Sequence, residues 1–164
     1  MAKGNRILVS TPPGGAKGVT VGGIVSGTPK PGTVMQIKAA TEPVNGRFTW
    51  EAYDRSYDAQ PGTIAVLLDD PLQGRSNSTA YASGERCEIY FPAMGDELNM
   101  IIENVVGTAD DYAIGDYLEV NDGTGKLQDA NTGTTHNYAA PFQCLETITD
   151  PTADYLAHVM YTGQ

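Results

Sequence analysis

A short phrase recurs along this chain and opens one apolar run after another. A glycine followed by threonine or aspartate precedes such runs at residues 32–37, 62–67, 95–102 and 115–120. Glycine adopts the positive backbone angles that tight turns need, and the apolar runs have lengths typical of β-strands. The recurrence therefore predicts a chain of short strands joined by tight turns, with little helix.

The expected strands have alternating or wholly apolar patterns. Phe48, Trp50 and Ala52 fall on one face of a strand, whereas residues 64–68 are apolar throughout, as in a strand buried on both sides. Many short strands indicate an all-β body, either a small β-barrel of the β-tulip kind or a sandwich. The core is expected to contain Phe48, Trp50, Ile64, Val66, Ile89 and Phe91. Strands are predicted at residues 33–39, 47–53, 63–68, 85–91, 98–105, 116–120, 126–129, 141–147 and 155–161.

A second phrase, a glycine and a basic residue, opens further strands at Gly46-Arg47 and Gly125-Lys126. One interpretation is an ancient duplication that divides the body, residues 33–164, into sub-modules 33–106 and 107–164. The other is that a glycine turn before a strand is a common local solution. The uneven spacing of the copies favours the second interpretation.

The N-terminal residues have a different composition from the body. Residues 1–33 contain eight glycines and four prolines around two short β-branched stretches, too little apolar surface for a separate core. We expect residues 1–32 to form an extended arm that adds as a strand to a sheet edge, in its own molecule or in another. A disordered tail is the alternative.

Charge is abundant and unevenly placed. The chain has 10 basic and 20 acidic residues, a net charge of −10, which argues against binding to nucleic acid or to an anionic membrane. Residues 1–50 carry six basic groups against one acid, and residues 51–164 carry four against nineteen. Either the two ends meet different partners, or the arm lies on its own acidic body. The first residues lack a secretory signal and no run reaches membrane-spanning length, so synthesis and first residence in a cytoplasm are expected.

The reactive residues do not form a catalytic or metal-binding motif. Cys87 and Cys144 are expected to be reduced thiols rather than a disulfide, and His136 and His158 to be structural. Acidic clusters such as Asp110-Asp111 with Asp116 allow a carboxylate hydrolase only as a remote alternative. We therefore predict no enzymatic activity, no metal and no cofactor. A carbohydrate-binding module or head-fibre component that exposes tyrosines is the second functional interpretation; its candidates are Tyr112, Tyr117, Tyr138, Tyr155 and Tyr161.

The order of segments in residues 31–92 resembles the head decoration, or cement, proteins of tailed bacteriophages, such as that of lambda. Pro31-Gly32-Thr33-Val34-Met35 leads into the aromatic strand at residues 46–54, a Gly-Thr-Ile-Ala strand at 62–68, and a final strand at 81–91. This sequence continues past residue 92, where the short members of that family end.

The resemblance implies a structural virion protein, made in the host cytoplasm and bound to the outer surface of the assembled capsid. Its partners would be the major capsid protein and further copies of itself, with a trimer favoured and a dimer as the alternative; no nucleic acid or membrane is expected. The basic residues of the arm would meet acidic capsid surface, and its apolar residues would add to capsid sheets. The predicted contact residues are Lys3, Arg6, Ile7, Leu8, Val9, Lys17, Val19, Val21 and Lys30.

Overall fold

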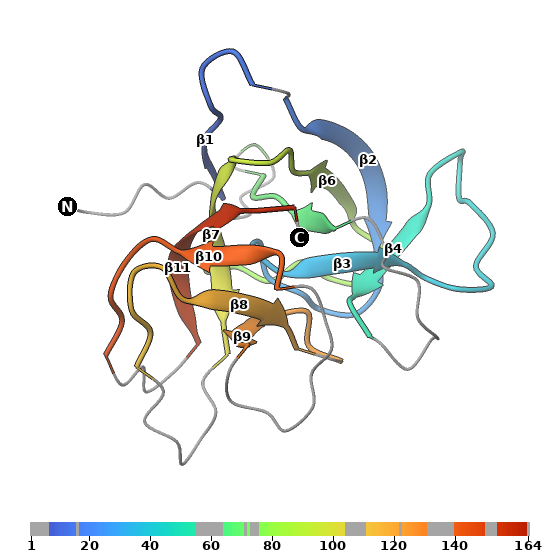
Figure 1. Cartoon of the computed structure of the whole chain (residues 1–164). Coiled ribbons are helices and arrows are strands. Elements are labelled where there is room, and N and C mark those ends of the chain that lie inside the picture. Colours follow the sequence, from blue (N-terminus) through green and yellow to red (C-terminus); the bar gives the residue numbers. More distant parts are fainter. Residues whose placement is uncertain are drawn as a thin grey trace.

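The computed structural model confirms an all-β protein and describes most of the chain. Its described residues form eleven strands and no α-helix (Figure 1). All nine strands expected in the body are present, each one overlapping its predicted range. The described residues are 7–15, 17–54, 64–70, 72, 76–103, 111–121, 123–130, 140–149 and 154–163.

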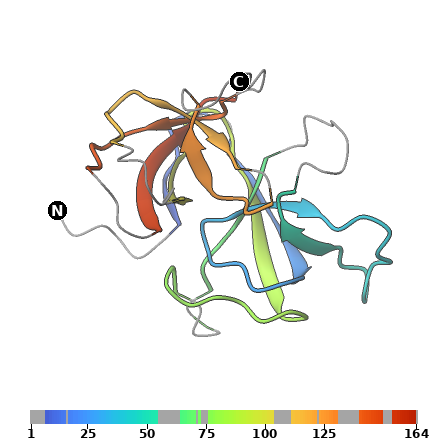
Figure 2. The same ribbon diagram turned by 90° about the horizontal axis from the view of Figure 1, so that it is seen from below.

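The strands form two barrels, which lie side by side in Figure 2, and five strands close into the first. The strands run in the order β2-β4-β3-β5-β6, and β6 pairs back to β2. β2 and β4 are parallel, whereas the other four pairings are antiparallel. The members are β2 (Val19–Val25), β3 (Val34–Ile37), β4 (Thr49–Ala52), β5 (Ala65–Leu67) and β6 (Arg86–Phe91).

The remaining strands form a second sheet, which also closes on itself. Its order is β1-β7-β11-β10-β8-β9, and β9 pairs in parallel with β7, so that β7 to β11 complete a ring. The short β1 is added to the edge of β7. The members are β1 (Leu8–Ser10), β7 (Glu97–Ile102), β8 (Tyr117–Val120), β9 (Leu127–Asp129), β10 (Phe142–Cys144) and β11 (Tyr155–Tyr161).

The two barrels are repeats of one design. β7 to β11 have the same partners and directions as β2 to β6, and the registers also agree. The two repeats meet at the turn between β6 and β7, and their origin by duplication stays a prediction. In the first barrel Val25 pairs with Trp50, Ile37 with Trp50, Met35 with Ala65 and Leu67 with Ile89; in the second, Ile102 pairs with Leu127, Val120 with Leu127, Leu118 with Phe142 and Cys144 with Val159.

The N-terminal segment is part of both barrels from residue 7 onward, which differs from the expected extended arm. Ile7 is fully buried, and β2 pairs with β6 along six residues. A Cβ atom on Gly23 would lie 2.4 Å from Cδ1 of Trp50, so the bare backbone of β2 is what lets this ring lie inside the barrel. The strand addition therefore takes place within the chain's own sheets.

Side chains and backbone join the barrels into one body. One core cluster fills the first barrel around Trp50, while the other fills the second barrel and includes Val34, Val66 and Tyr90 from the first. The Tyr90 hydroxyl donates a buried hydrogen bond of 2.6 Å to Oδ2 of Asp96. Of the predicted core, Trp50, Val66 and Ile89 are buried, and Ile64 and Phe91 are partly buried against the clusters.

Candidate partner-binding surfaces

The predicted contact residues do not form one surface. Lys3 and Arg6 lie outside the described residues. Ile7 is buried, and Leu8 and Val21 are partly buried against the two cores, so these three stabilise the fold instead of facing a partner. The exposed members are Val9 on β1, Lys17 and Val19 at the start of β2, and Lys30 before β3.

Lys17 and Val19 do lie together, at one end of the first barrel. Val19 is 60% exposed although it begins a strand, and Lys17 precedes it by two residues. The surface that they form is small, but both predicted contact residues are exposed on it.

The two barrels differ sharply in charge. Residues 7–91 carry seven basic against eight acidic residues, a net charge of −1. Residues 92–164 carry one basic residue, Lys126, against twelve acidic residues, a net charge of −11. Two barrels of the same design therefore present very different surfaces, and an acidic partner is repelled far less by the first barrel than by the second.

A long hairpin projects from the first barrel between β3 and β4 (Figure 1). At its tip the backbone of Val44 and Arg47 is joined by two hydrogen bonds, of 2.9 and 3.0 Å. Asn45 and Gly46 between them have φ angles of 52° and 72°, as in the two-residue turn that suits strand twist. Twelve residues separate the paired Ile37 and Trp50, against six between their equivalents Val120 and Leu127. The second barrel closes without the extra six residues, so the fold does not require them.

The hairpin exposes apolar side chains. Ile37, Val44 and Phe48 are each 49% exposed. Phe48 was expected in the core on the same face as Trp50; that prediction was wrong, because Phe48 lies just before β4 and its side chain is half exposed. Exposed apolar groups gathered on a projecting segment are typical of a protein interface. The charged groups beside them are Lys38, Glu42 and Arg47.

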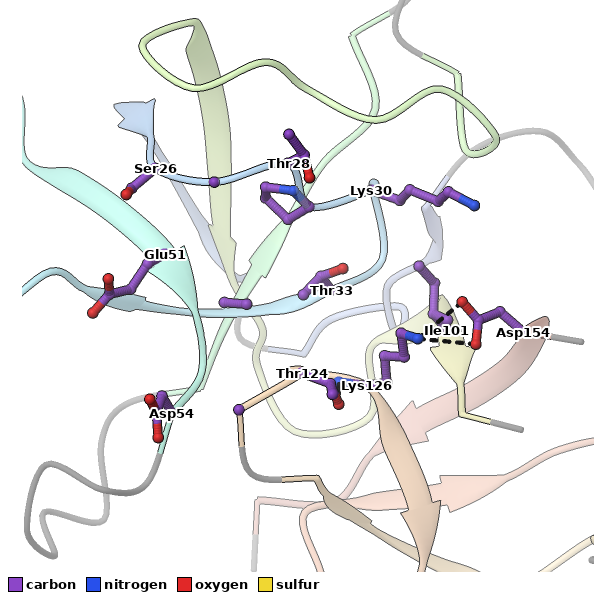
Figure 3. A pocket seen from close by; sticks show the side chains of 14 residues that line it. Ser26, Thr28, Lys30, Thr33, Glu51, Asp54, Ile101, Thr124, Lys126 and Asp154 are labelled. Atoms are coloured by element: carbon purple, nitrogen blue, oxygen red, sulfur yellow. Dashed lines mark hydrogen bonds and ion pairs between the residues drawn. The ribbon is translucent and has the colours of Figure 1, made fainter. Parts of the chain in front are cut away.

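A pocket of about 560 Å³ opens where the barrels meet (Figure 3). Its lining carries both signs of charge and several hydroxyl groups. Lys126 Nζ makes an ion pair with Asp154, at 2.9 Å from Oδ2, while Lys30 and Glu51 lie on opposite sides. Lys126 and Asp154 directly precede β9 and β11, so this ion pair joins the starts of two strands and stabilises the fold.

The candidate catalytic and metal-binding groups have structural surroundings. Both cysteines are buried and form no disulfide, as expected, and burial raises the pKa of Cys87 to about 12, which keeps this thiol protonated. His158 Nε2 lies 3.0 Å from Oε2 of Glu97 on the neighbouring strand. Asp116 accepts a hydrogen bond from the Ala113 N–H and so closes its own turn. The described ranges contain no group of three or more metal-ligating side chains, and His136 and Asp110 lie outside them.

The tyrosines named as sugar-binding candidates differ in exposure. Tyr112 is buried, Tyr155 and Tyr161 are partly buried against the second core, and Tyr117 is 42% exposed. Tyr138 lies outside the described residues.

Within the described part of the chain, no helix is long and apolar enough to cross a membrane. The sequence matches no protein-family model and no curated protein.

Proposed function

We propose that this chain is a structural protein of a phage virion, without enzymatic activity, that binds the outer surface of the assembled capsid as a homo-oligomer. The major capsid protein is its partner, and the protein reaches the capsid from the host cytoplasm. The observation that carries the proposal is the unequal charge of two joined barrels of one design, −1 against −11. Such a molecule has one side suited to a protein surface and one side suited to solvent.

Two further points support this orientation. The segment that resembles phage head decoration proteins, residues 31–92, covers β3 to β6 and so falls within the first barrel. The exposed Lys17 and Val19 also belong to that barrel. A protein that binds the assembled capsid, and not its separate subunits, stabilises the assembly by mass action, and an oligomer adds avidity.

Capsid binding is tested with a charge reversal at the exposed surface. Deletion of residues 1–30 is a poor test, because it removes β2 from the first barrel. We expect Lys17→Glu to weaken co-sedimentation with expanded capsids at least about tenfold, as for an interface charge placed against its complement. Thr147→Glu, an exposed position on the second barrel, is the control and should bind normally.

Cryo-electron microscopy of decorated capsids gives the deciding view. Density for the first barrel against the capsid, with the acidic barrel outward, is the expected result. Failure of the wild-type protein to co-sediment with capsids, or binding through the second barrel, would overturn the proposal.

A further inference from the structure

The contact between the two barrels of one chain joins two surfaces, and each surface has an equivalent on the other barrel. A face of the first barrel, formed by residues 31–34 with Val66 and Tyr90, is buried against the second barrel. The Val34 N–H donates to the Gly125 carbonyl at 2.7 Å, and the Ile101 N–H donates to the Gly32 carbonyl at 3.1 Å. We call this the donor face.

The second barrel carries the equivalent of the donor face, and there it is uncovered. Register equates Val34 with Tyr117, since Val34 pairs with Val66 as Tyr117 pairs with Gln143. Val34 is 1% exposed but Tyr117 is 42% exposed. Three residues before each, Pro31 is buried whereas Ile114 is 68% exposed.

Hydrogen bonding differs between the two faces. The Gly32 carbonyl accepts from the Ile101 N–H across the seam. The Gly115 carbonyl, equivalent to that of Gly32, accepts from the side chain of Gln143 and so is already satisfied within the barrel. The second donor face therefore offers exposed apolar side chains, and not a repeat of this hydrogen bond.

The surface that receives the donor face is also repeated. In the second barrel it consists of the β7 edge near Asn99 and the turn at residues 123–125. Its equivalent in the first barrel is the β2 edge near Gly22 and the hairpin residues 46–48, because Val25 and Trp50 correspond to Ile102 and Leu127. We call this the receiving surface.

The receiving surface of the first barrel is exposed at Gly22 and Phe48. The two groups equivalent to the Ile101 N–H and the Gly125 carbonyl, the Ile24 N–H and the Phe48 carbonyl, bond each other. The exposed Phe48 lies at the position of Gly125, and its carbonyl accepts from the Ile24 N–H at 3.0 Å with one lone pair still available. An exposed aromatic residue beside an exposed strand is typical of a surface that associates.

Charge favours a second copy as the occupant. Arg47 on the receiving surface lies over Gly22, with its Cζ atom 3.7 Å from where a Cβ would stand. Asp111 and Asp116 flank Ile114 and Tyr117 on the outer donor face. The barrel of charge −11 thus meets the barrel of charge −1, and two acidic barrels are not brought together.

We propose that copies of this chain associate head to tail, with the donor face of one copy's second barrel seated on the receiving surface of the next copy's first barrel. A contact between two different surfaces closes into a ring when the rotation permits, so that barrels alternate around it. The proposal rests on the homo-oligomer of the proposed function but not on capsid binding, which is measured separately.

Oligomeric state, measured by sedimentation velocity on the isolated protein, tests this. The wild type should be a ring with a mass that is a multiple of 17.4 kDa. Tyr117→Glu and Phe48→Glu should each weaken association at least about tenfold, as for central aromatic residues of interfaces. Val9→Glu, which adds the same charge at a residue of similar exposure (47%), should leave the ring intact.

Mixing the two variants distinguishes this contact from a symmetric one. Tyr117→Glu retains a working receiving surface and Phe48→Glu retains a working donor face, so the mixture should yield a one-to-one dimer that neither variant forms alone. A monomeric wild type, a ring insensitive to both substitutions, or a mixture without the dimer would overturn the proposal. Capsid binding by a monomeric wild type would leave the proposed function standing while refuting the ring.

Discussion

Gly125 is the point at which one methyl group should force the barrels apart. It has a φ of +66°, and its carbonyl accepts the Val34 N–H across the seam. A Cβ atom here would stand 2.3 Å from the Val34 carbonyl oxygen and 3.1 Å from the Tyr53 nitrogen. Because both neighbours are backbone atoms, neither can rotate away, so Gly125→Ala must shift one barrel against the other.

The expected loss of stability has two causes, and a comparison with Gly123 separates them. Alanine in left-handed backbone costs about 1–2 kcal/mol, and overpacking adds about 1–3 kcal/mol. Gly123 lies in the same turn with a φ of +79°, yet a Cβ there meets nothing within 4 Å. We therefore expect Gly125→Ala to reduce the free energy of unfolding by about 2–5 kcal/mol and Gly123→Ala by about 1–2 kcal/mol.

Urea unfolding followed by two probes measures the difference. The fluorescence of Trp50, the single tryptophan, reports on the first barrel, while far-ultraviolet circular dichroism reports on all strands. The two transitions should coincide in the wild type, since one core cluster spans the seam. Equal losses for the two alanine variants would refute the argument from the seam contact.

Three further predictions concern stability. Burial raises the pKa of Cys87 to about 12, and burial together with the Asp96 carboxylate raises the pKa of Tyr90 to about 12. Because the unfolded chain ionises these groups at lower pH, the free energy of unfolding should be highest below about pH 8.5 and should fall as the pH rises towards 12. Urea titrations at several pH values measure this fall. Tyr90→Phe removes the hydroxyl that donates to the buried Asp96, so the free energy of unfolding should fall by about 1–3 kcal/mol. Thermal melting measures this, and an unchanged melting temperature would contradict that role. Leu127→Ala, at a fully buried position, should cost about 2–5 kcal/mol, whereas Phe48→Ala in dilute, monomeric protein should change unfolding by less than about 0.5 kcal/mol; comparable losses would show that Phe48 is part of the core after all.

The strands of the body could be predicted because their local signals agree with the fold. The runs at β6 and β11 were placed within one residue of their observed bounds, since alternation and a preceding turn residue both mark them. β2 was missed as a barrel strand because Gly22 and Gly23 suggest flexible backbone. The reason for Gly23 is the ring of Trp50, which lies 27 positions later and leaves no mark near residue 23.

The repetition was visible in the sequence but misaligned. The phrases at residues 32–34 and 115–117 occupy equivalent places, each with a glycine at positive φ. The second phrases do not, because register equates Gly46 with Gly123, two residues before Gly125. Six extra hairpin residues in the first barrel shift the spacing, and only the pairing registers reveal that shift. The exposed Phe48 could not be foreseen for the same reason.

The pairing of β1 with β7 bears on the order of events during synthesis. The first barrel is complete at Phe91, when β7 has not yet been made. Domains generally fold as they emerge from the ribosome, so the first barrel can close while Val34, Val66 and Tyr90 still face water. β1, although made first, has no partner until Leu98 appears. β1 is thus synthesised first but is among the last strands to be paired. Until then it is available to a chaperone or a neighbouring chain.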